Sequence, residues 1–320
     1  MVRAGLVLGA GGMVGQAYNA GVLAALEQDL GWDPRTADVV VGTSAGSVTG
    51  TALRLGVAAA DLFASSCEAP LSPEGAAFFA LIDGADEDLP VPSPLHLLRG
   101  WRPPSGRLLA RAVREPWTLR AGVVAGSLLP PGRYDLRERT RVLDRLGRGW
   151  PSDLWVCAAR RDDGRRAVFG RDSMPIARLS DAVAASCAIP GYFAPVQIGT
   201  RHYVDGGVHS PTNADVLTHA GLDVVVVVSS MSAAHGATRR PDAAIRWAAH
   251  RRLEQEIALL RAQGTAVVRF EPDRATLATM GLNPMAEHRN EAVAIAARTS
   301  AVGHAQSARS LRRLAPLLAA

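Results

Sequence analysis

Lysine is absent from the 320-residue sequence, so arginine supplies all 35 basic side chains. Two explanations stay open: a codon bias of the genome, or a use of guanidinium groups, which bind phosphate better than ammonium groups do. The net charge of +5 and the pI of about 9.7 favour contact with an anionic membrane surface. The basic residues are scattered and no basic run is interleaved with aromatics, so nucleic acid is not an expected partner.

Cysteine is also scarce, with three residues far apart in the chain, Cys67, Cys157 and Cys187. They form neither a disulfide framework nor a set with metal-ligand spacing, and no metal or other cofactor is implied. Sparse cysteine fits a reducing compartment. No charged segment followed by a long apolar stretch opens the chain, and no apolar run approaches the roughly 20 residues of a membrane span. These absences predict a cytoplasmic protein.

The first 55 residues alternate between predicted strands and predicted helices. Gly5–Leu8 and Asp38–Val41 are short apolar runs typical of buried strands, and helical periodicity follows each of them at about 16–30 and 47–55. This order predicts a parallel sheet with helices on its faces. We therefore expect one α/β domain over residues 1–320, with three α/β/α layers and a mainly parallel central sheet.

The rest of the chain supports the same fold class. A Pro-rich stretch at about 70–107 predicts an insertion over the sheet. The core of the domain is expected at about 5–230, and a helical C-terminal part follows it at about 242–318. The other predicted elements are a helix at 136–146, a hairpin at 154–169 around Asp162-Asp163-Gly164, a helix at 179–186, and strands at 196–198, 202–204 and 223–229.

The pentapeptide Gly42-Thr43-Ser44-Ala45-Gly46 has the G-x-S-x-G pattern and lies between a predicted strand and a predicted helix. A serine at such a sharp turn presents its hydroxyl at the carboxyl edge of the sheet, and Gly42 and Gly46 must be small because backbones approach closely there. The helix that follows points its amide end toward developing negative charge. Ser44 is the candidate nucleophile; on the residues alone, a tight turn with a helix-capping serine is the alternative.

A second glycine-rich segment, Gly9 to Gly15, reads GAGGMVG. Its backbone N–H groups could stabilise an oxyanion, and each such donor can be worth about 3 kcal/mol. The same segment also looks like the start of a dinucleotide-binding fold, which would make the protein an oxidoreductase. That fold requires an acidic residue at the end of the second strand, whereas this strand ends at Val41 and runs into Gly42.

A nucleophilic serine needs a base, and Asp205 is the candidate. It follows a short predicted strand and precedes the flexible pair Gly206-Gly207, so its carboxylate could reach a neighbouring serine hydroxyl. A turn aspartate is the alternative, because Asp is common before Gly-Gly. None of the eight histidines lies in a setting that marks a triad member, although His202 and His209 flank Asp205.

Motifs in a particular order make the sequence similar to the patatin-like phospholipase family over about residues 5–230. They are the glycine-rich segment with Gly21-Val22-Leu23, the Ser44 pentapeptide, Ser186-Cys187-Ala188-Ile189-Pro190, and Asp205-Gly206-Gly207. The resemblance implies hydrolysis of lipid acyl esters by a Ser–Asp dyad without a catalytic histidine. Matched residue by residue, it implies Ser44 as nucleophile, Asp205 as base, and an oxyanion hole from the backbone of Gly11, Gly12 and Met13, supported by Gly9 and Gly15.

One position departs from the family pattern. Val14 stands where the family's glycine loop usually carries a basic residue, and the spacing from Gly12 to Gly21 is one residue longer than usual. Backbone donors survive that change, whereas a phosphate-facing charge is lost, which leaves open a preference for neutral esters. A lipid-binding protein with little turnover and acyl transfer to an alcohol remain alternatives. Asp205 would also need burial to raise its pKa, because an exposed carboxylate is a weak base at neutral pH.

Overall fold

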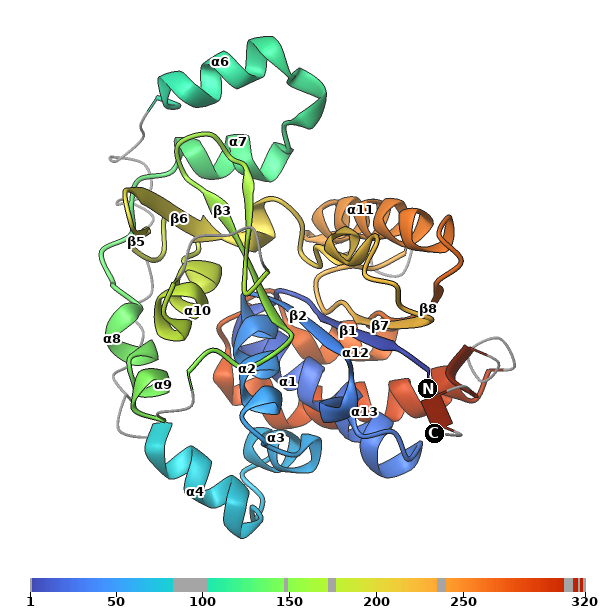
Figure 1. The fold of residues 1–320 in the computed structure, drawn as a ribbon. Helices are drawn as coiled ribbons and strands as arrows, with labels where there is room; N and C mark the ends of the chain where they lie inside the picture. The colour runs from blue at the N-terminus through green and yellow to red at the C-terminus, as the bar shows by residue number, and fades with distance from the viewer. Residues whose placement is uncertain are drawn as a thin grey trace.

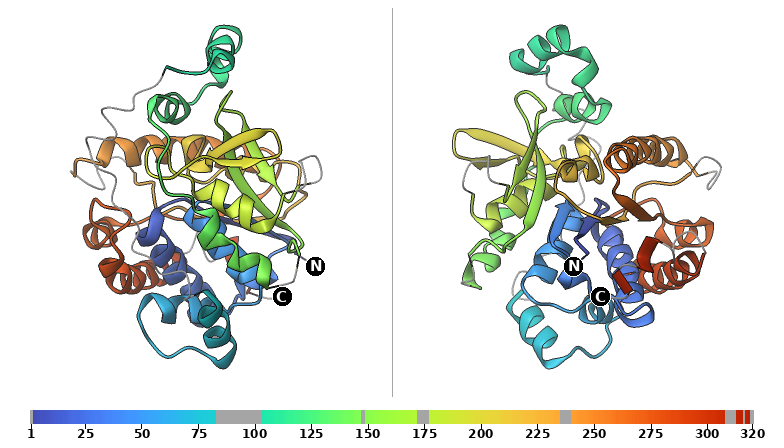
Figure 2. Two further views of the ribbon diagram at one scale, coloured as in Figure 1. Left: turned by 90° about the vertical axis from the view of Figure 1, so that its left-hand side faces the viewer. Right: turned by 45° about the vertical axis from the view of Figure 1, so that its right-hand side comes forward.

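The computed structural model describes residues 2–82, 103–146, 149–171, 177–234, 240–307, 313–315 and 317–318. A central sheet lies between helices on both of its faces (Figures 1 and 2). The larger apolar core lies between the sheet and helices that include α1 (Gly12–Ala24) and α13 (Asn290–Ala305), and the smaller core lies under α11 (Ala243–Arg261). The predicted α/β fold class is confirmed.

The sheet runs in the order β5-β6-β3-β2-β1-β7-β8, with β4 paired to β3. The neighbours from β3 through β2, β1 and β7 to β8 pair in parallel, whereas β4, β5 and β6 pair antiparallel. Parallel strands buried on both faces are uniformly apolar, as in the five valines of β7. The strands are β1 (Ala4–Leu8), β2 (Val39–Thr43), β3 (Leu154–Arg160), β4 (Arg166–Phe169), β5 (Val196–Ile198), β6 (Arg201–Asp205), β7 (Val224–Val228) and β8 (Ala266–Phe270).

The helices match the sequence analysis in part. The predicted hairpin is formed by β3 and β4. The helix predicted at 136–146 is instead two short helices, α8 and α9. Strand β8 and helix α12 were not predicted. Of the predicted insertion, residues 83–102 lie outside the described residues. The remaining helices are α2 (Ala45–Arg54), α3 (Ala59–Ser66), α4 (Pro73–Ile82), α6 (Gly106–Arg114), α7 (Ala121–Leu128), α8 (Arg137–Thr140), α9 (Val142–Arg145), α10 (Leu179–Cys187) and α12 (Arg274–Met280).

Helices α6 and α7 form a lobe that projects from the rest of the molecule at the top of Figure 1. A one-turn 3₁₀ helix, η4 (Pro116–Thr118), joins them. The lobe meets the body where α7 lies against a second 3₁₀ turn, η5 (Gly206–Val208): a Cβ atom at Gly122 would lie 2.5 Å from the carbonyl oxygen of Val208. This close approach fixes α7 next to the segment that directly follows Asp205.

Candidate active site

Ser44 occupies a sharp turn between β2 and α2. Its backbone angles, φ 52° and ψ −122°, lie in a region that residues other than glycine rarely adopt, and such strain persists where the surroundings enforce it. The flanking glycines permit the turn. A Cβ atom at Gly46 would overlap the carbonyl oxygen of Leu8, and one at Gly42 would lie 2.5 Å from the Cα atom of Ser47. The pentapeptide thus has the strand–turn–helix form that its pattern predicts.

Strand β3 brings Ser44 and Asp205 together. Thr43, the residue before Ser44, pairs with Cys157 of β3, and Asp205 pairs with Ala158, the next residue of the same strand. Both side chains are nearly closed to solvent, with Ser44 4% and Asp205 5% exposed. The Ser44 hydroxyl group lies close enough to the Asp205 carboxyl group to lower its pKa. Two residues far apart in sequence therefore form a buried pair.

The environment of Asp205 makes it a stronger base than an exposed carboxylate. Burial raises the pKa of Asp205 from 3.8 to about 6, against the opposing effects of the Ser44 side chain and the Gly207 backbone N–H. The Gly207 N–H donates to Asp205 Oδ1 over 2.7 Å. The carboxyl group is therefore ionised at neutral pH, held in one orientation by Gly207, and close to the Ser44 hydroxyl group.

The Ser186–Pro190 motif stabilises the turn at Ser44, a role that the sequence analysis did not assign to it. The Ser44 N–H donates to Ser186 Oγ over 2.8 Å, and Ser186 Oγ donates to the Cys157 carbonyl oxygen over 2.7 Å. The neighbouring thiol, Cys187, lies 3.7 Å from Ser47 Oγ. Burial raises the pKa of Cys187 to about 12, so this thiol stays protonated and does not compete as a nucleophile.

The glycine-rich segment is shorter than predicted, because α1 already begins at Gly12 rather than near Gln16. The N–H groups of Gly9 and Ala10 donate to backbone carbonyls. Those of Gly11, Gly12 and Met13 have no acceptor within the described parts of the chain. They form the amino end of a 13-residue helix, where the helix dipole favours negative charge.

The positions of β1 and β2 bring this amino end to the same sheet edge as Ser44. The two strands are parallel neighbours, and Leu8 pairs with Gly42 at their carboxyl ends. Ser230 supports the segment, since its Oγ atom donates to the Ala10 carbonyl oxygen over 2.7 Å. A Cβ atom at Gly11 would overlap that same Oγ atom, so a larger residue at position 11 would displace the segment.

Asn213 is a site residue that the sequence analysis missed. Its side chain is fully buried, and its amide nitrogen donates to Thr43 Oγ1 over 3.1 Å and to the Ser210 carbonyl oxygen over 2.7 Å. His209 Nδ1 lies 3.3 Å from Asn213 Oδ1. Burial, reinforced by nearby arginines, lowers the pKa of His209 to about 3, so the ring is neutral at physiological pH. The left-handed backbone of Asn213, φ 53°, is common for Asn but carries no signal in the sequence.

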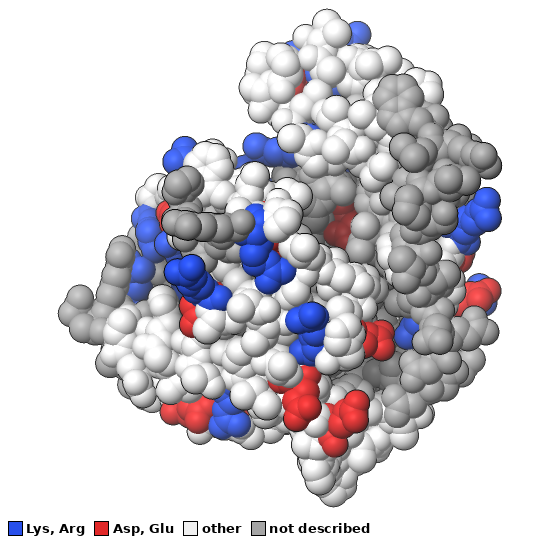
Figure 3. Space-filling view, turned by 180° about the vertical axis from the view of Figure 1, so that it is seen from behind, with Lys and Arg blue, Asp and Glu red and all other residues white. Residues whose placement is uncertain are grey.

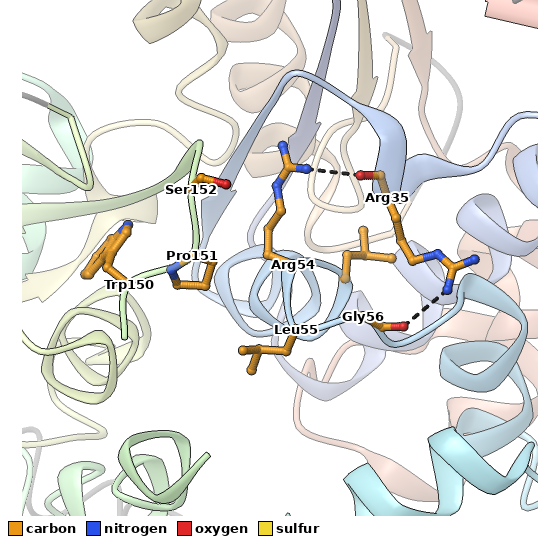
Figure 4. A pocket seen from close by; sticks show the side chains of 8 residues that line it. Arg35, Arg54, Leu55, Gly56, Trp150, Pro151 and Ser152 are labelled. Atoms are coloured by element: carbon orange, nitrogen blue, oxygen red, sulfur yellow. Dashed lines mark hydrogen bonds between the residues drawn. The ribbon is translucent and has the colours of Figure 1, made fainter. Parts of the chain in front are cut away.

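A pocket of about 460 Å³ lies at the opposite end of α2 from Ser44 (Figure 4). Arg54 crosses it and donates to the Arg35 carbonyl oxygen over 3.0 Å, while Arg35 donates to the Gly56 carbonyl oxygen over 3.2 Å. At 1.5 Å per residue, the ten residues of α2 separate this pocket from Ser44 by about 15 Å. The pocket therefore belongs to another part of the surface.

Among the described residues, no group of three or more His, Cys, Asp or Glu side chains could hold a metal ion. Within the same part of the chain, no helix combines the length and the apolar character of a membrane span.

The sequence matches the family model described as patatin-like phospholipase over residues 6–218. The chain belongs to the patatin-like phospholipase family. This confirms the resemblance drawn from the motifs and makes the protein a member of a class of lipid ester hydrolases. The match includes Ser44 and Asp205, and it gives no support to a nucleotide-binding oxidoreductase.

Three solved structures illustrate what this chain is similar to. VipD from Legionella pneumophila is 15% identical, with a TM-score of 0.41, and the match covers 96% of this chain and 67% of VipD. The ExoU–SpcU complex of Pseudomonas aeruginosa is 18% identical, with a TM-score of 0.37, and the match covers 100% of this chain and 52% of that chain. Human GIVD cytosolic phospholipase A2 is 12% identical, with a TM-score of 0.43, and the match covers 99% of this chain and 63% of that chain. The chain thus spans about half to two-thirds of these chains. No curated protein matches the sequence significantly.

Proposed function

We propose that this patatin-like protein hydrolyses fatty-acyl esters through Ser44 and Asp205. The observation that carries the proposal is the buried pair itself: a strained serine at a strand-to-helix turn, next to a carboxyl group whose pKa burial raises to about 6. A nucleophile beside a base of suitable pKa is the arrangement that covalent acyl transfer requires.

In the first half-reaction, Ser44 Oγ attacks the ester carbonyl carbon while Asp205 accepts the hydroxyl proton. The carbonyl oxygen becomes an oxyanion, which the N–H groups of Gly11, Gly12 and Met13 would stabilise at the amino end of α1. When the carbon–oxygen bond to the alcohol breaks, the protonated Asp205 gives its proton to the leaving oxygen. An acyl-Ser44 ester remains.

In the second half-reaction, water attacks the acyl-Ser44 carbonyl and passes a proton to Asp205. The oxyanion forms against the same N–H groups and collapses with release of Ser44 Oγ, which takes the proton back from Asp205. The free fatty acid leaves, and both residues return to their starting states. A single carboxylate serves both steps because proton acceptance and donation alternate.

Val14 bears on the choice of substrate. It is 2% exposed, and its N–H donates to the Pro284 carbonyl oxygen over 3.0 Å, so the position supplies no cation to a bound phosphate. We therefore propose that ester hydrolysis does not depend on a charge at this position, and that neutral acyl esters are substrates together with phospholipids.

A fluorophosphonate probe tests the proposal, because it reacts covalently with activated serines and hardly with ordinary ones. We expect the wild-type protein to be labelled, Ser44→Ala not to be labelled, and Asp205→Asn to be labelled at least about a hundredfold more slowly. Ser152→Ala, in the pocket of Figure 4, is the matched control and should label as the wild type does. A folded wild-type protein that resists the probe would support a lipid-binding role without turnover.

A further inference from the structure

Apolar side chains are exposed on the lobe of α6, η4 and α7. Leu109 is 52% exposed and Val113 is 83% exposed, and their spacing of four residues puts both on one side of α6. Trp117 of η4 is 76% exposed, and Val124 of α7 is also exposed. A cluster of large apolar side chains on a projecting element marks an interaction surface.

The charges around this apolar surface are mostly positive. Arg107 and Arg165 have side chains 68% and 56% exposed, and each has one carboxylate nearby. Arg114 is exposed and has no ion-pair partner among the residues that the structure describes. Seen from behind, the described part of the top of the molecule shows few charged side chains (Figure 3).

The lobe is connected to the candidate active site. Helix α7 lies against η5, where Gly122 approaches the Val208 carbonyl oxygen, and η5 directly follows Asp205. The surface is hollowed directly below the lobe, and Asp or Glu side chains lie in the hollow (Figure 3). Whatever binds the lobe is therefore held next to the segment that carries Asp205.

We propose that the lobe of α6, η4 and α7 docks the protein on an anionic lipid surface. Exposed leucine, valine and tryptophan side chains insert at the level of the lipid headgroups, where tryptophan is favoured, and the exposed arginines pair with anionic lipids. A second copy of the chain fits this surface less well, because arginines would face arginines across the interface. The docking surface goes beyond the proposed hydrolysis and does not require it.

Vesicle co-sedimentation tests the docking, with Ser44→Ala as the parent protein so that lipid stays intact. The vesicles contain phosphatidylcholine, with or without about one-third phosphatidylglycerol. We expect Leu109→Asp and Trp117→Asp each to lower the partition coefficient about tenfold or more on the anionic vesicles. Leu259→Asp is the matched control: Leu259 is 50% exposed within α11, away from the lobe, and its change should leave binding as it was.

Two results would overturn the inference: equal loss of binding in Leu109→Asp and Leu259→Asp, or dimers in sedimentation velocity that Trp117→Asp dissociates without any effect on vesicles. Added salt should weaken the binding, since exposed charge pairs are screened.

A separate assay distinguishes failure of the docking from failure of the proposed hydrolysis. With a water-soluble short-chain ester, Leu109→Asp in the otherwise wild-type protein should retain full activity, whereas no activity in the wild-type protein would refute the hydrolysis and leave the vesicle result standing.

Discussion

The side-chain amide of Asn213 donates a hydrogen bond of 3.1 Å to Thr43 Oγ1. Thr43 immediately precedes Ser44, and the same amide nitrogen lies 3.5 Å from the carbonyl oxygen of Gly206, which immediately follows Asp205. One buried side chain therefore contacts both turns of the candidate dyad. Asn213 is in place to fix the distance between the serine and the carboxylate.

We expect Asn213→Gly to lower kcat about tenfold to a hundredfold with little change in KM, because a small misplacement of the dyad slows the chemical step more than binding. Glycine adopts the left-handed backbone without strain, so this change removes only the side chain. Glu68→Gly, at an exposed residue that is also left-handed, is the control and should keep its kcat. Steady-state kinetics on a soluble ester measures both; a change in KM alone would contradict the positioning role.

The pH dependence of hydrolysis should follow Asp205. Because burial raises the pKa of Asp205 to about 6, we expect kcat/KM to be constant above pH 7, to reach half its maximum near pH 6, and to fall about tenfold per pH unit below pH 5. An uncharged ester substrate keeps other ionisations out of the profile. A midpoint near pH 4 would show that the carboxylate is exposed to solvent in the working enzyme.

Asp205→Asn should stabilise the protein at alkaline pH. Asp205 binds its proton more tightly in the folded state than in the unfolded state, so its contribution to stability is present below about pH 4 and is lost as pH rises to about 6. Above that pH the buried charge costs about 3 kcal/mol. We expect urea denaturation to show a higher free energy of unfolding for Asp205→Asn at pH 8, by up to that amount, and no gain at pH 4. A less stable variant at pH 8 would mean that the hydrogen bonds of the carboxylate outweigh its burial.

Gly46→Ala should destabilise the fold, because a Cβ atom there overlaps the carbonyl oxygen of Leu8 and forces α2 away from β1. We expect a loss of about 1–3 kcal/mol in the free energy of unfolding, as for other overpacked sites. Gly303→Ala provides the contrast, since a Cβ atom meets nothing within 4 Å in α13, and alanine there should add about 0.5–1 kcal/mol. Thermal unfolding of both variants measures the change in stability. Equal changes in the two variants would contradict the close contact at Gly46.

Sequence predicted the parts of the fold whose signals are local. The turn at Ser44 follows from two glycines around a small tripeptide, and the apolar run of β7 follows from its valines, because each segment determines its own conformation. The strand and the glycine pair around Asp205 suggested its pairing with Ser44, and the family's motifs specified it. The three-layer arrangement followed from the alternation of strands and helices.

The parts that sequence missed depend on distant partners. Strand β8 was not predicted, since its five residues gain their conformation by pairing with β7. The start of α1 at Gly12 was placed too late, because glycines are poor helix formers and a contact with the Pro284 carbonyl oxygen helps to hold the first turn. Asn213 gave no sign of its role, because Thr43 is 170 residues away.

That separation has a consequence for the growing polypeptide. Strand β2 and the turn at Ser44 are synthesised well before Asn213. The Asn213 loop is itself anchored by Glu256, which accepts hydrogen bonds from the Ala214 N–H and the Thr212 hydroxyl. Proteins are synthesised at about 5–20 residues per second, so the nascent chain carries Ser44 for many seconds before its partners exist. If Ser44 is the nucleophile that we propose, it becomes reactive only after Asp205, Asn213 and Glu256 have been synthesised and have folded around it.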